Sequence, residues 1–252
     1  MTIPSTLFTI AQFSDCHLFA DKNTEHFGAN VWSNLTQVLT DITNRDNIDC
    51  AIFTGDLTQD HSEVSYQNFV EAIVKAKLTI PVYFLAGNHD DKNMFAKYLT
   101  KPIFNTENSI NQEYWQIQLV DSKSETPSGL VNDIALGKLT QQIEGNKFQL
   151  LMMHHHPIDI GYHIDKHGLV NQQTFWQKIN QLNTENRNIK AIACGHVHRA
   201  SQLYKDSVTI FTCPATSVQF GDTKEKMASL EPSYRLLYLH SNGTIDSEII
   251  TP

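Results

Sequence analysis

The chain has 252 residues, of which 40% are hydrophobic and 18% are charged, as in a globular protein rather than a disordered one. Its formal net charge of −8 at pH 7 disfavours a polymeric nucleic acid or an anionic membrane as the partner. The four cysteines form no C-x-x-C pair, and neither a signal peptide nor a membrane span is visible, so we expect reduced cysteines and a cytoplasmic location.

The first third of the chain repeats one pattern, in which a short apolar strand ends in polar residues and a helix follows. Strands are predicted at residues 7–14, 50–54 and 81–86, and helices with apolar residues at helical spacing at 29–45 and 64–76. Strands that alternate with helices indicate βαβ units and a parallel sheet.

The second half has more strands and fewer helices. Residues 121–132 and 221–232 are predicted to be loops. No internal repeat or linker divides the chain, so we predict one α/β domain over residues 1–252. The remaining strands are predicted at 114–121, 148–153, 189–194, 208–213, 234–240 and 245–249, and the remaining helices at 132–144 and 173–182.

Five of the predicted strands end in side chains that can bind a metal ion. Because ligands of an α/β sheet bind beyond the carboxyl ends of its strands, we expect these side chains to converge. Imidazole and carboxylate ligands together suit manganese, iron or zinc. Two such ions need a shared anionic bridge, for which Asp56 is the natural candidate, while Asn88 offers a neutral oxygen. The five endings are Asp15-Cys16-His17, Gly55-Asp56, Asn88-His89-Asp90, His155 with its neighbours, and His196-Val197-His198.

Each of these groups also has a structural interpretation. The acidic and amide residues could cap the helices that follow their strands. The histidines could be hydrogen-bonded core residues, and His89 could support a site without taking part in its chemistry. The H-x-H spacing of His196 and His198 places both imidazoles on one side of a strand end, which weakens the structural interpretation.

In this order, the motifs D-x-H, G-D, G-N-H-D, H-H-P and G-H-x-H resemble the calcineurin-like metallophosphoesterase superfamily. The stretches SDCHLF, LAGNHDD, HHHPIDIG, CGHVHR and CPATSVQF are similar to one group within it, the bacterial class III cyclic nucleotide phosphodiesterases. The resemblance runs along nearly the whole chain. It implies a four-layer α/β/β/α sandwich with two mixed sheets.

The resemblance implies two divalent metal ions, iron or manganese, with zinc as the other candidate. The family's ligand lies two residues before Pro157, which selects His155 over the alternative His154. One ion would be held by Asp15, His17, Asp56 and His198, and the other by Asp56, Asn88, His155 and His196.

The reaction that the resemblance implies is hydrolysis of a 3′,5′-cyclic nucleotide, with cyclic AMP giving 5′-AMP, by a hydroxide that bridges the two metals. His89 would be the catalytic histidine, and Asp90 would orient it and raise its pKa. The substrate would contact His17, Asn88, His89 and His198.

Two other functions remain open. The same metal motifs would serve an enzyme for another phosphodiester or for a phosphomonoester. A non-catalytic scaffold of this fold is expected to lack some ligands, whereas all seven positions and His89 are filled here. His61 is expected in a solvated loop. The sequence leaves open the metal, the base of the nucleotide, the choice between monomer and dimer, and the roles of residues 221–232, His163, His167 and Arg199.

Overall fold

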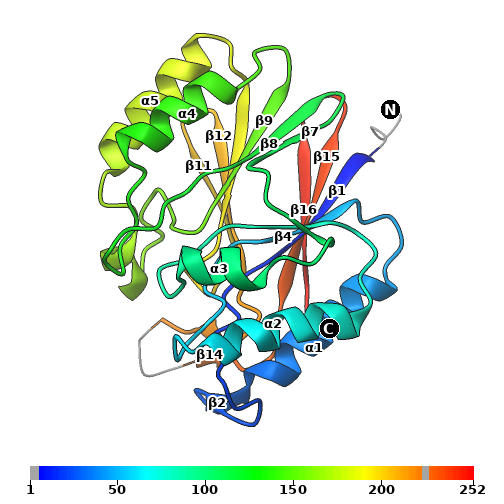
Figure 1. Cartoon of the computed structure of the whole chain (residues 1–252). Coiled ribbons are helices and arrows are strands. Elements are labelled where there is room, and N and C mark those ends of the chain that lie inside the picture. Colours follow the sequence, from blue (N-terminus) through cyan, green and yellow to red (C-terminus); the bar gives the residue numbers. More distant parts are fainter. Residues whose placement is uncertain (1–5, 223–226) are drawn as a thin grey trace.

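Two six-stranded mixed sheets form the centre of the molecule in the computed structural model, which describes residues 6–222 and 227–252 (Figure 1). The first sheet contains β1 (Thr6–Phe13), β4 (Cys50–Phe53), β5 (Val82–Phe84), β6 (Phe104–Asn105), β15 (Tyr234–His240) and β16 (Ile245–Ile250). The second contains β7 (Ser109–Asn111), β8 (Trp115–Leu119), β9 (Phe148–Met153), β10 (Ile189–Cys194), β11 (Ser201–Lys205) and β12 (Val208–Thr212). Their strand orders are β16-β15-β1-β4-β5-β6 and β11-β12-β10-β9-β8-β7.

Helices cover the outer face of each sheet (Figure 1). The first sheet carries α1 (Val31–Asn44), α2 (Glu63–Ala76) and α3 (Lys92–Tyr98), and the second carries α4 (Asp133–Gln142) and α5 (Gln172–Thr184). A 3-10 helix, η1, spans His163–His167. The two sheets and their helices make four α/β/β/α layers, so the expected fold is confirmed.

The central strands are mostly apolar because both of their faces are buried. Ile52 and Met152 belong to the core between the two sheets. Their neighbours Phe53 and Met153 pack against the helices on the outer faces. Each such side chain contributes about 1.5–3 kcal/mol when it is removed from water. This two-sided burial explains why the predicted strands read as continuous apolar runs.

The parallel strands bring the carboxyl ends of each sheet to one edge. In the first sheet, β1, β4, β5 and β6 run parallel, and in the second, β8, β9, β10 and β12 do so. Antiparallel strands lie at the sides, where β15 and β16 flank β1, β11 flanks β12, and β7 flanks β8. The loops that follow the parallel strands therefore share one end of the molecule.

The structure adds short elements that the sequence did not predict, namely α3, η1, β6, β7, β11 and two small hairpins. One hairpin pairs β2 (Glu25–His26) with β3 (Ala29–Asn30), and the other pairs β13 (Gln219–Phe220) with β14 (Met227–Ser229). The segment 221–232, predicted as a loop, thus contains a strand, and its residues 223–226 lie outside the described residues. None of the helices in the described part of the chain is long and apolar enough to span a membrane.

Candidate metal centre

Residues that follow five strands meet at the shared end of the two sheets. The backbone amide of Asp15 donates to the carbonyl of Gly55 at 2.8 Å. The amide of His196, from the second sheet, donates to Asp15 Oδ2 at 3.0 Å, and the amide of His89 donates to Asp56 Oδ1 at 2.8 Å. The structure therefore brings together side chains from both sheets, as the strand-end pattern predicted.

The same residues do not cap helices. The side chains that accept at the helix N-termini after β1, β4 and β5 are Asn30, Ser62 and Asp91. Asp15 and Asp56 instead lie in tight loops before those helices. The structural interpretation that made them N-caps is therefore wrong.

The backbone of these loops is held in an unfavourable conformation. Five of the predicted ligands have φ between 47° and 69°, in the left-handed region that costs a non-glycine residue about 1–3 kcal/mol. Close packing excludes a larger residue than glycine at position 87, because a Cβ on Gly87 would lie 2.2 Å from Asp56 Oδ1. Strain of this kind collects at functional sites, where the surrounding structure maintains it. The five residues are Asp15, His17, Asp56, His196 and His198.

One group of possible ligands comprises Asp15, His17 and His198. The Nε2 atoms of the two histidines lie 3.0 Å apart, and His198 Nε2 lies 3.4 Å from Asp15 Oδ1. The Nδ1 atoms are engaged elsewhere, with Gln59 Oε1 and with the carbonyl of Val218, each at 2.8 Å. If each Nδ1 carries the hydrogen, both Nε2 lone pairs face the shared space, which is the arrangement of metal-binding imidazoles.

A second group surrounds the Nε2 atom of His154. This atom lies 3.1 Å from Asn88 Oδ1, 3.2 Å from His196 Nδ1 and 3.4 Å from Asp56 Oδ2. Ligand atoms of one ion with bonds of about 2.1 Å have separations of this size. The Nδ1 of His154 lies 2.7 Å from the carbonyl of Thr54, which directs Nε2 into the group.

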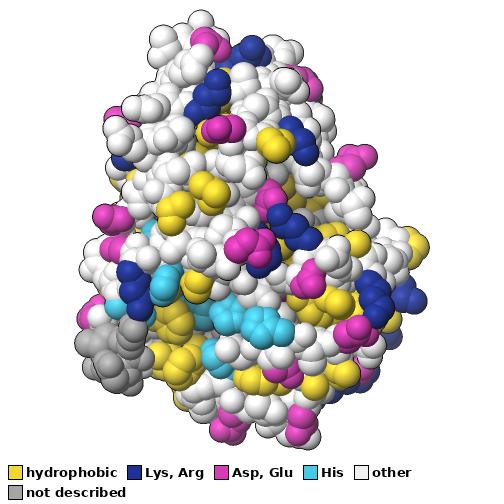
Figure 2. Space-filling model, turned by 60° about the vertical axis from the view of Figure 1, so that its left-hand side comes forward, with side chains coloured by type: hydrophobic (Ala, Val, Ile, Leu, Met, Phe, Trp, Pro, Cys, Tyr) yellow, Lys and Arg dark blue, Asp and Glu magenta, His cyan; other side chains and the backbone are white. Residues whose placement is uncertain are grey.

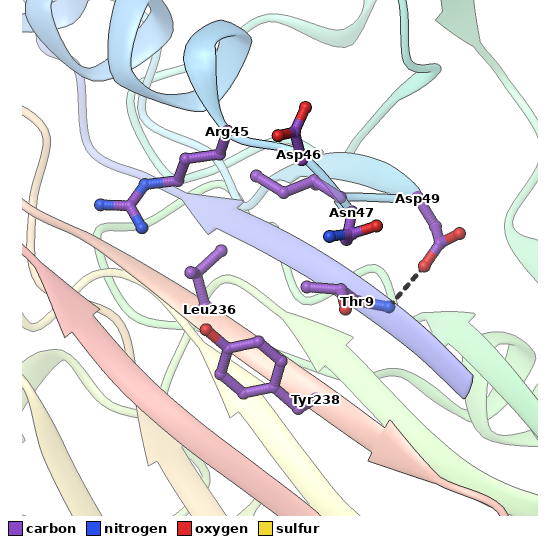
Figure 3. Close-up of a pocket in the computed structure, with 8 residues that line it drawn as sticks. Thr9, Arg45, Asp46, Asn47, Asp49, Leu236 and Tyr238 are labelled. Carbon is purple, nitrogen blue, oxygen red and sulfur yellow. Dashed lines mark hydrogen bonds between the residues drawn. The ribbon is translucent and has the colours of Figure 1, made fainter. Parts of the chain in front are cut away.

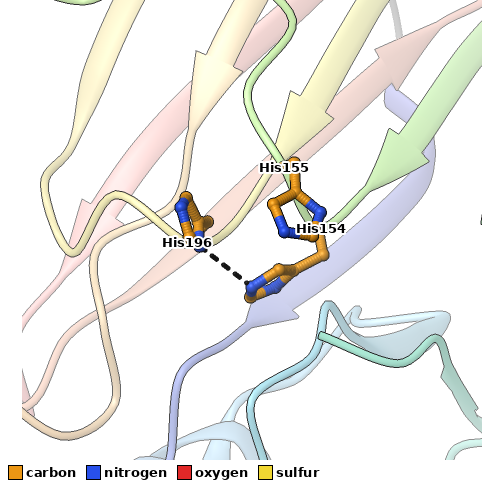
Figure 4. A group of neighbouring side chains, drawn as sticks. All are labelled: His154, His155 and His196. Carbon is orange, nitrogen blue, oxygen red and sulfur yellow. Dashed lines mark hydrogen bonds between the residues drawn. The ribbon is translucent and has the colours of Figure 1, made fainter. Parts of the chain in front are cut away.

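His155 was the predicted ligand, and its ring lies beside those of His154 and His196 (Figure 4). Its Nδ1 lies 3.0 Å from Ser122 Oγ and its Nε2 lies 3.2 Å from the carbonyl of Pro127. Although His154, His155 and His196 lie close together, His154 is the one that contacts both Asp56 and Asn88. Because β9 ends at Met153, the three histidines lie beyond the strand, and strand alternation does not set their side-chain directions.

Burial controls the charges of these groups. It lowers the pKa of His17 and His196 well below 6.5, which keeps both imidazoles neutral and able to bind a metal. Burial alone would raise the pKa of Asp56, but the adjoining His154 reverses this and holds that pKa below its usual range. Burial alone would lower the pKa of His154, but the adjoining Asp56 raises it to about 9, so a metal ion bound at His154 Nε2 would replace a proton there.

Comparisons with known proteins identify the family. A model of the calcineurin-like phosphoesterase family matches residues 8–200. The chain belongs to this family. It is 49% identical to a probable cyclic nucleotide phosphodiesterase of Colwellia psychrerythraea, over 96% of this chain and 94% of that protein. It is 31% identical to the 3′,5′-cyclic adenosine monophosphate phosphodiesterase CpdA of Escherichia coli K12, over 95% and 88% of the two chains.

Solved structures agree on the fold of this phosphoesterase. A dimetal phosphatase from Danio rerio superposes with a TM-score of 0.67 at 11% sequence identity, over 98% of this chain and 99% of that chain. At such low identity the likeness establishes the fold alone.

His89, predicted to be the catalytic histidine of the phosphoesterase, lies beside both groups. Its ring packs edge-on against His17, with centroids 4.9 Å apart. Among the described residues, no partner hydrogen-bonds to the buried Nδ1 of His89. Burial lowers the pKa of His89, in contrast to the rise expected from Asp90.

Asp90 contacts the backbone of the loops instead of the His89 ring. Its carboxylate accepts from the amides of Asp56 and Leu57 at 2.8 Å and from Gly87 at 2.9 Å. Burial, followed by repulsion from Asp56, raises the pKa of Asp90 to about 7. These hydrogen bonds join the loop after β4 to the loop after β5, and the role of Asp90 toward His89 stays a prediction.

Two histidines at the site were missed by sequence reasoning. His26 stacks on His17 at 5.2 Å, and His61 stacks on His89 at 5.7 Å with its Nδ1 3.0 Å from the His89 carbonyl. His61 is exposed, as expected, but it covers a predicted catalytic residue. Figure 2 shows how histidines gather into a band on this face, with hydrophobic side chains beside them. No strand-end motif marks His26, so its position depends on the β2–β3 hairpin.

The residues whose roles the sequence leaves open lie at the edge of the site. Arg199 forms an ion pair with Asp222 at 3.0 Å and lies 5.4 Å from the ring of Tyr162, so it has partners within the protein. His163 and His167 lie on η1, and the His163 ring is 5.6 Å from that of Phe220.

A cavity of about 630 Å³ lies at the opposite end of β4 from the metal-binding residues (Figure 3). The segment 45–49, which precedes β4, forms one of its walls. Two of its polar groups are already paired: Asp49 Oδ2 accepts from the amide of Thr9 at 2.7 Å, and Arg45 forms an ion pair with Asp41 at 2.6 Å. The cavity contains no histidine and has no part in the candidate centre.

Proposed function

We propose that this calcineurin-like phosphoesterase hydrolyses 3′,5′-cyclic nucleotides, with cyclic AMP giving 5′-AMP, and uses two divalent cations. The observation that carries the proposal is the pair of ligand groups on either side of Asp56. The Oδ2 atom of Asp56 lies 3.8 Å from His17 Nε2 and 3.4 Å from His154 Nε2. The relatives named as cyclic nucleotide phosphodiesterases support the choice of substrate.

The proposed ligand sets follow from these contacts. When bound, divalent ions polarise a phosphate and lower the pKa of a water molecule. The mixture of imidazole, carboxylate and amide oxygen suits iron or manganese, with zinc as the other candidate. Asp15, His17, Asp56 and His198 would hold one ion, and Asp56, Asn88, His154 and His196 would hold the other.

His89 is the proposed catalytic residue. Its ring adjoins His17, and its Nδ1 has no hydrogen-bond partner among the described residues. A bound phosphate would favour the protonated ring, which would stabilise charge on phosphorus-bound oxygen or protonate the leaving 3′ oxygen.

The four buried cysteines are all free, which supports the proposed cytoplasmic location.

A comparison of substrates tests the proposal. The metal-loaded protein is assayed with cyclic AMP, cyclic GMP, bis(p-nitrophenyl) phosphate and p-nitrophenyl phosphate. We expect cyclic AMP to be hydrolysed and chromatography to identify 5′-AMP as the product. The His89→Ala variant should keep both ions by elemental analysis and lose about 10²- to 10⁴-fold in kcat. A protein that prefers the monoester and leaves cyclic AMP intact would have the second function, that of a phosphomonoesterase.

A further inference from the structure

The β2–β3 hairpin has an unusual residue at its tip. Phe27 and Gly28 both have positive φ, at 49° and 87°, as in a type I′ turn. The first central position of this turn is usually Asn, Asp or Gly, and a bulky side chain there is strained. Packing compensates only in part, because Phe27 remains 55% exposed. The chain therefore holds an aromatic ring in solvent at a conformational cost.

The strained ring adjoins the candidate metal centre by two routes. On one side, Phe27 packs against His26 at 4.4 Å, and His26 stacks on His17 at 5.2 Å. On the other side, Phe27 meets the edge of Phe220 at 6.4 Å, and Phe220 stacks on His198 at 4.0 Å with nearly parallel planes. One ring thus separates Phe27 from each of two proposed metal ligands.

We propose that Phe27 stacks against the base of the cyclic nucleotide while the phosphate lies at the metal-binding residues. The proposal rests on the function proposed above. In the nucleotide, the ribose lies between the phosphate and the base. In the protein, the rings of His26 and Phe220 lie between the proposed metal ligands and Phe27. Stacking on an aromatic ring is a general way to bind a base, and a purine offers more surface than a pyrimidine.

Phe27 fits this role better than Phe220. The ring of Phe220 is covered by His198 on one face and is only partly exposed. A change at Phe220 would disturb a proposed metal ligand, whereas Phe27 contacts neither ligand directly. Phe27 can therefore be altered without changing the metal centre.

The sharpest variant is Phe27→Asn, because Asn is favoured in this turn and removes the ring without breaking the hairpin. We compare kcat/KM for cyclic AMP and for the 3′,5′-cyclic phosphate of methyl ribofuranoside, which lacks a base. The loss of one base–aromatic stack predicts a decrease of about 5- to 150-fold for cyclic AMP and no change for the baseless diester. Calorimetry should show weaker binding of 5′-AMP and unchanged binding of ribose 5-phosphate.

Two variants control the experiment. Phe27→Tyr keeps an aromatic ring and should retain the preference for the ligand with a base. Tyr114→Asn removes an aromatic residue that is 40% exposed. Tyr114 precedes β8, at the end of the sheet far from the site. This variant should therefore change neither the ratio of kcat/KM for cyclic AMP to that for the baseless diester nor the ratio of the affinities for 5′-AMP and ribose 5-phosphate.

The outcomes separate the two proposals. In the first outcome, wild type hydrolyses cyclic AMP, but Phe27→Asn affects the compound with a base and the compound without one equally, or affects neither. Base stacking on Phe27 is then overturned and the proposed function stands. If wild type cleaves the baseless diester and leaves cyclic AMP intact, the proposed function fails and takes base stacking with it.

Discussion

Two adjacent histidines differ in what their ring nitrogens contact, and the difference predicts opposite effects of substitution. Because His154 faces Asp56 and Asn88, the variant His154→Ala should lose about one of two bound ions per chain and most of the turnover. Because His155 bonds to Ser122 and Pro127, His155→Ala should keep both ions. It should lose about 1–3 kcal/mol of unfolding free energy from the unpaired buried groups. Elemental analysis and urea unfolding measure the two quantities.

The reverse result, with metal lost only from His155→Ala, would restore the choice made from the sequence. Residue types and spacing predicted six further ligands, and the structure places these six residues at one end of the sheets. The same pattern could not choose within His154-His155-His156, because the ring directions depend on how the chain bends after β9. That bend is set by tertiary contacts, including the packing of Gly129 against the His155 ring.

At the scale of elements, hydrogen bonds to the Asp90 carboxylate join the loop after β4 to the loop after β5. The variant Asp90→Asn keeps the shape of the side chain but leaves one acceptor oxygen for three amides. We expect the free energy of unfolding to fall by about 2–3 kcal/mol, since bonds to a charged group are lost. Activity should fall as well, because these loops carry Asp56 and Asn88. Urea unfolding and steady-state kinetics provide the two readouts.

Asp91→Asn is the matched control, because Asp91 is the N-cap of α3 and Asn caps a helix equally well. It should change unfolding free energy by less than about 0.5 kcal/mol. A variant Asp90→Asn with unchanged stability and reduced kcat would instead support the sequence-based role of Asp90 beside His89.

The elements that the sequence predicted are those with long apolar patterns. The central strands have buried residues on both faces, and α1, α2, α4 and α5 show helical spacing, so all were found within a few residues. The strands of the β2–β3 and β13–β14 hairpins have only two or three residues, too few to show a period. They form because tertiary contacts select them, and His26 and Phe220 were missed with them.

On the scale of the whole molecule, the candidate centre joins the two sheets. Asp15, Asp56 and Asn88 follow strands of the first sheet, whereas His154 and His196 follow strands of the second. Ions held by ligands from both sheets would add contacts between the sheets.

Metal removal should therefore destabilise the entire fold as well as stop turnover. A ligand present at 100 times its Kd, and bound only by the folded state, adds about 2.7 kcal/mol to the free energy of unfolding. For a chain of this length, about 1 kcal/mol corresponds to a change of about 2–4 °C in Tm. We expect a chelator to lower Tm by about 5–10 °C, measured by calorimetry with metal content determined in parallel. His154→Ala should show a smaller chelator shift because one of its two sites is incomplete, and an unchanged Tm after complete metal loss would place the ions outside the junction between the sheets.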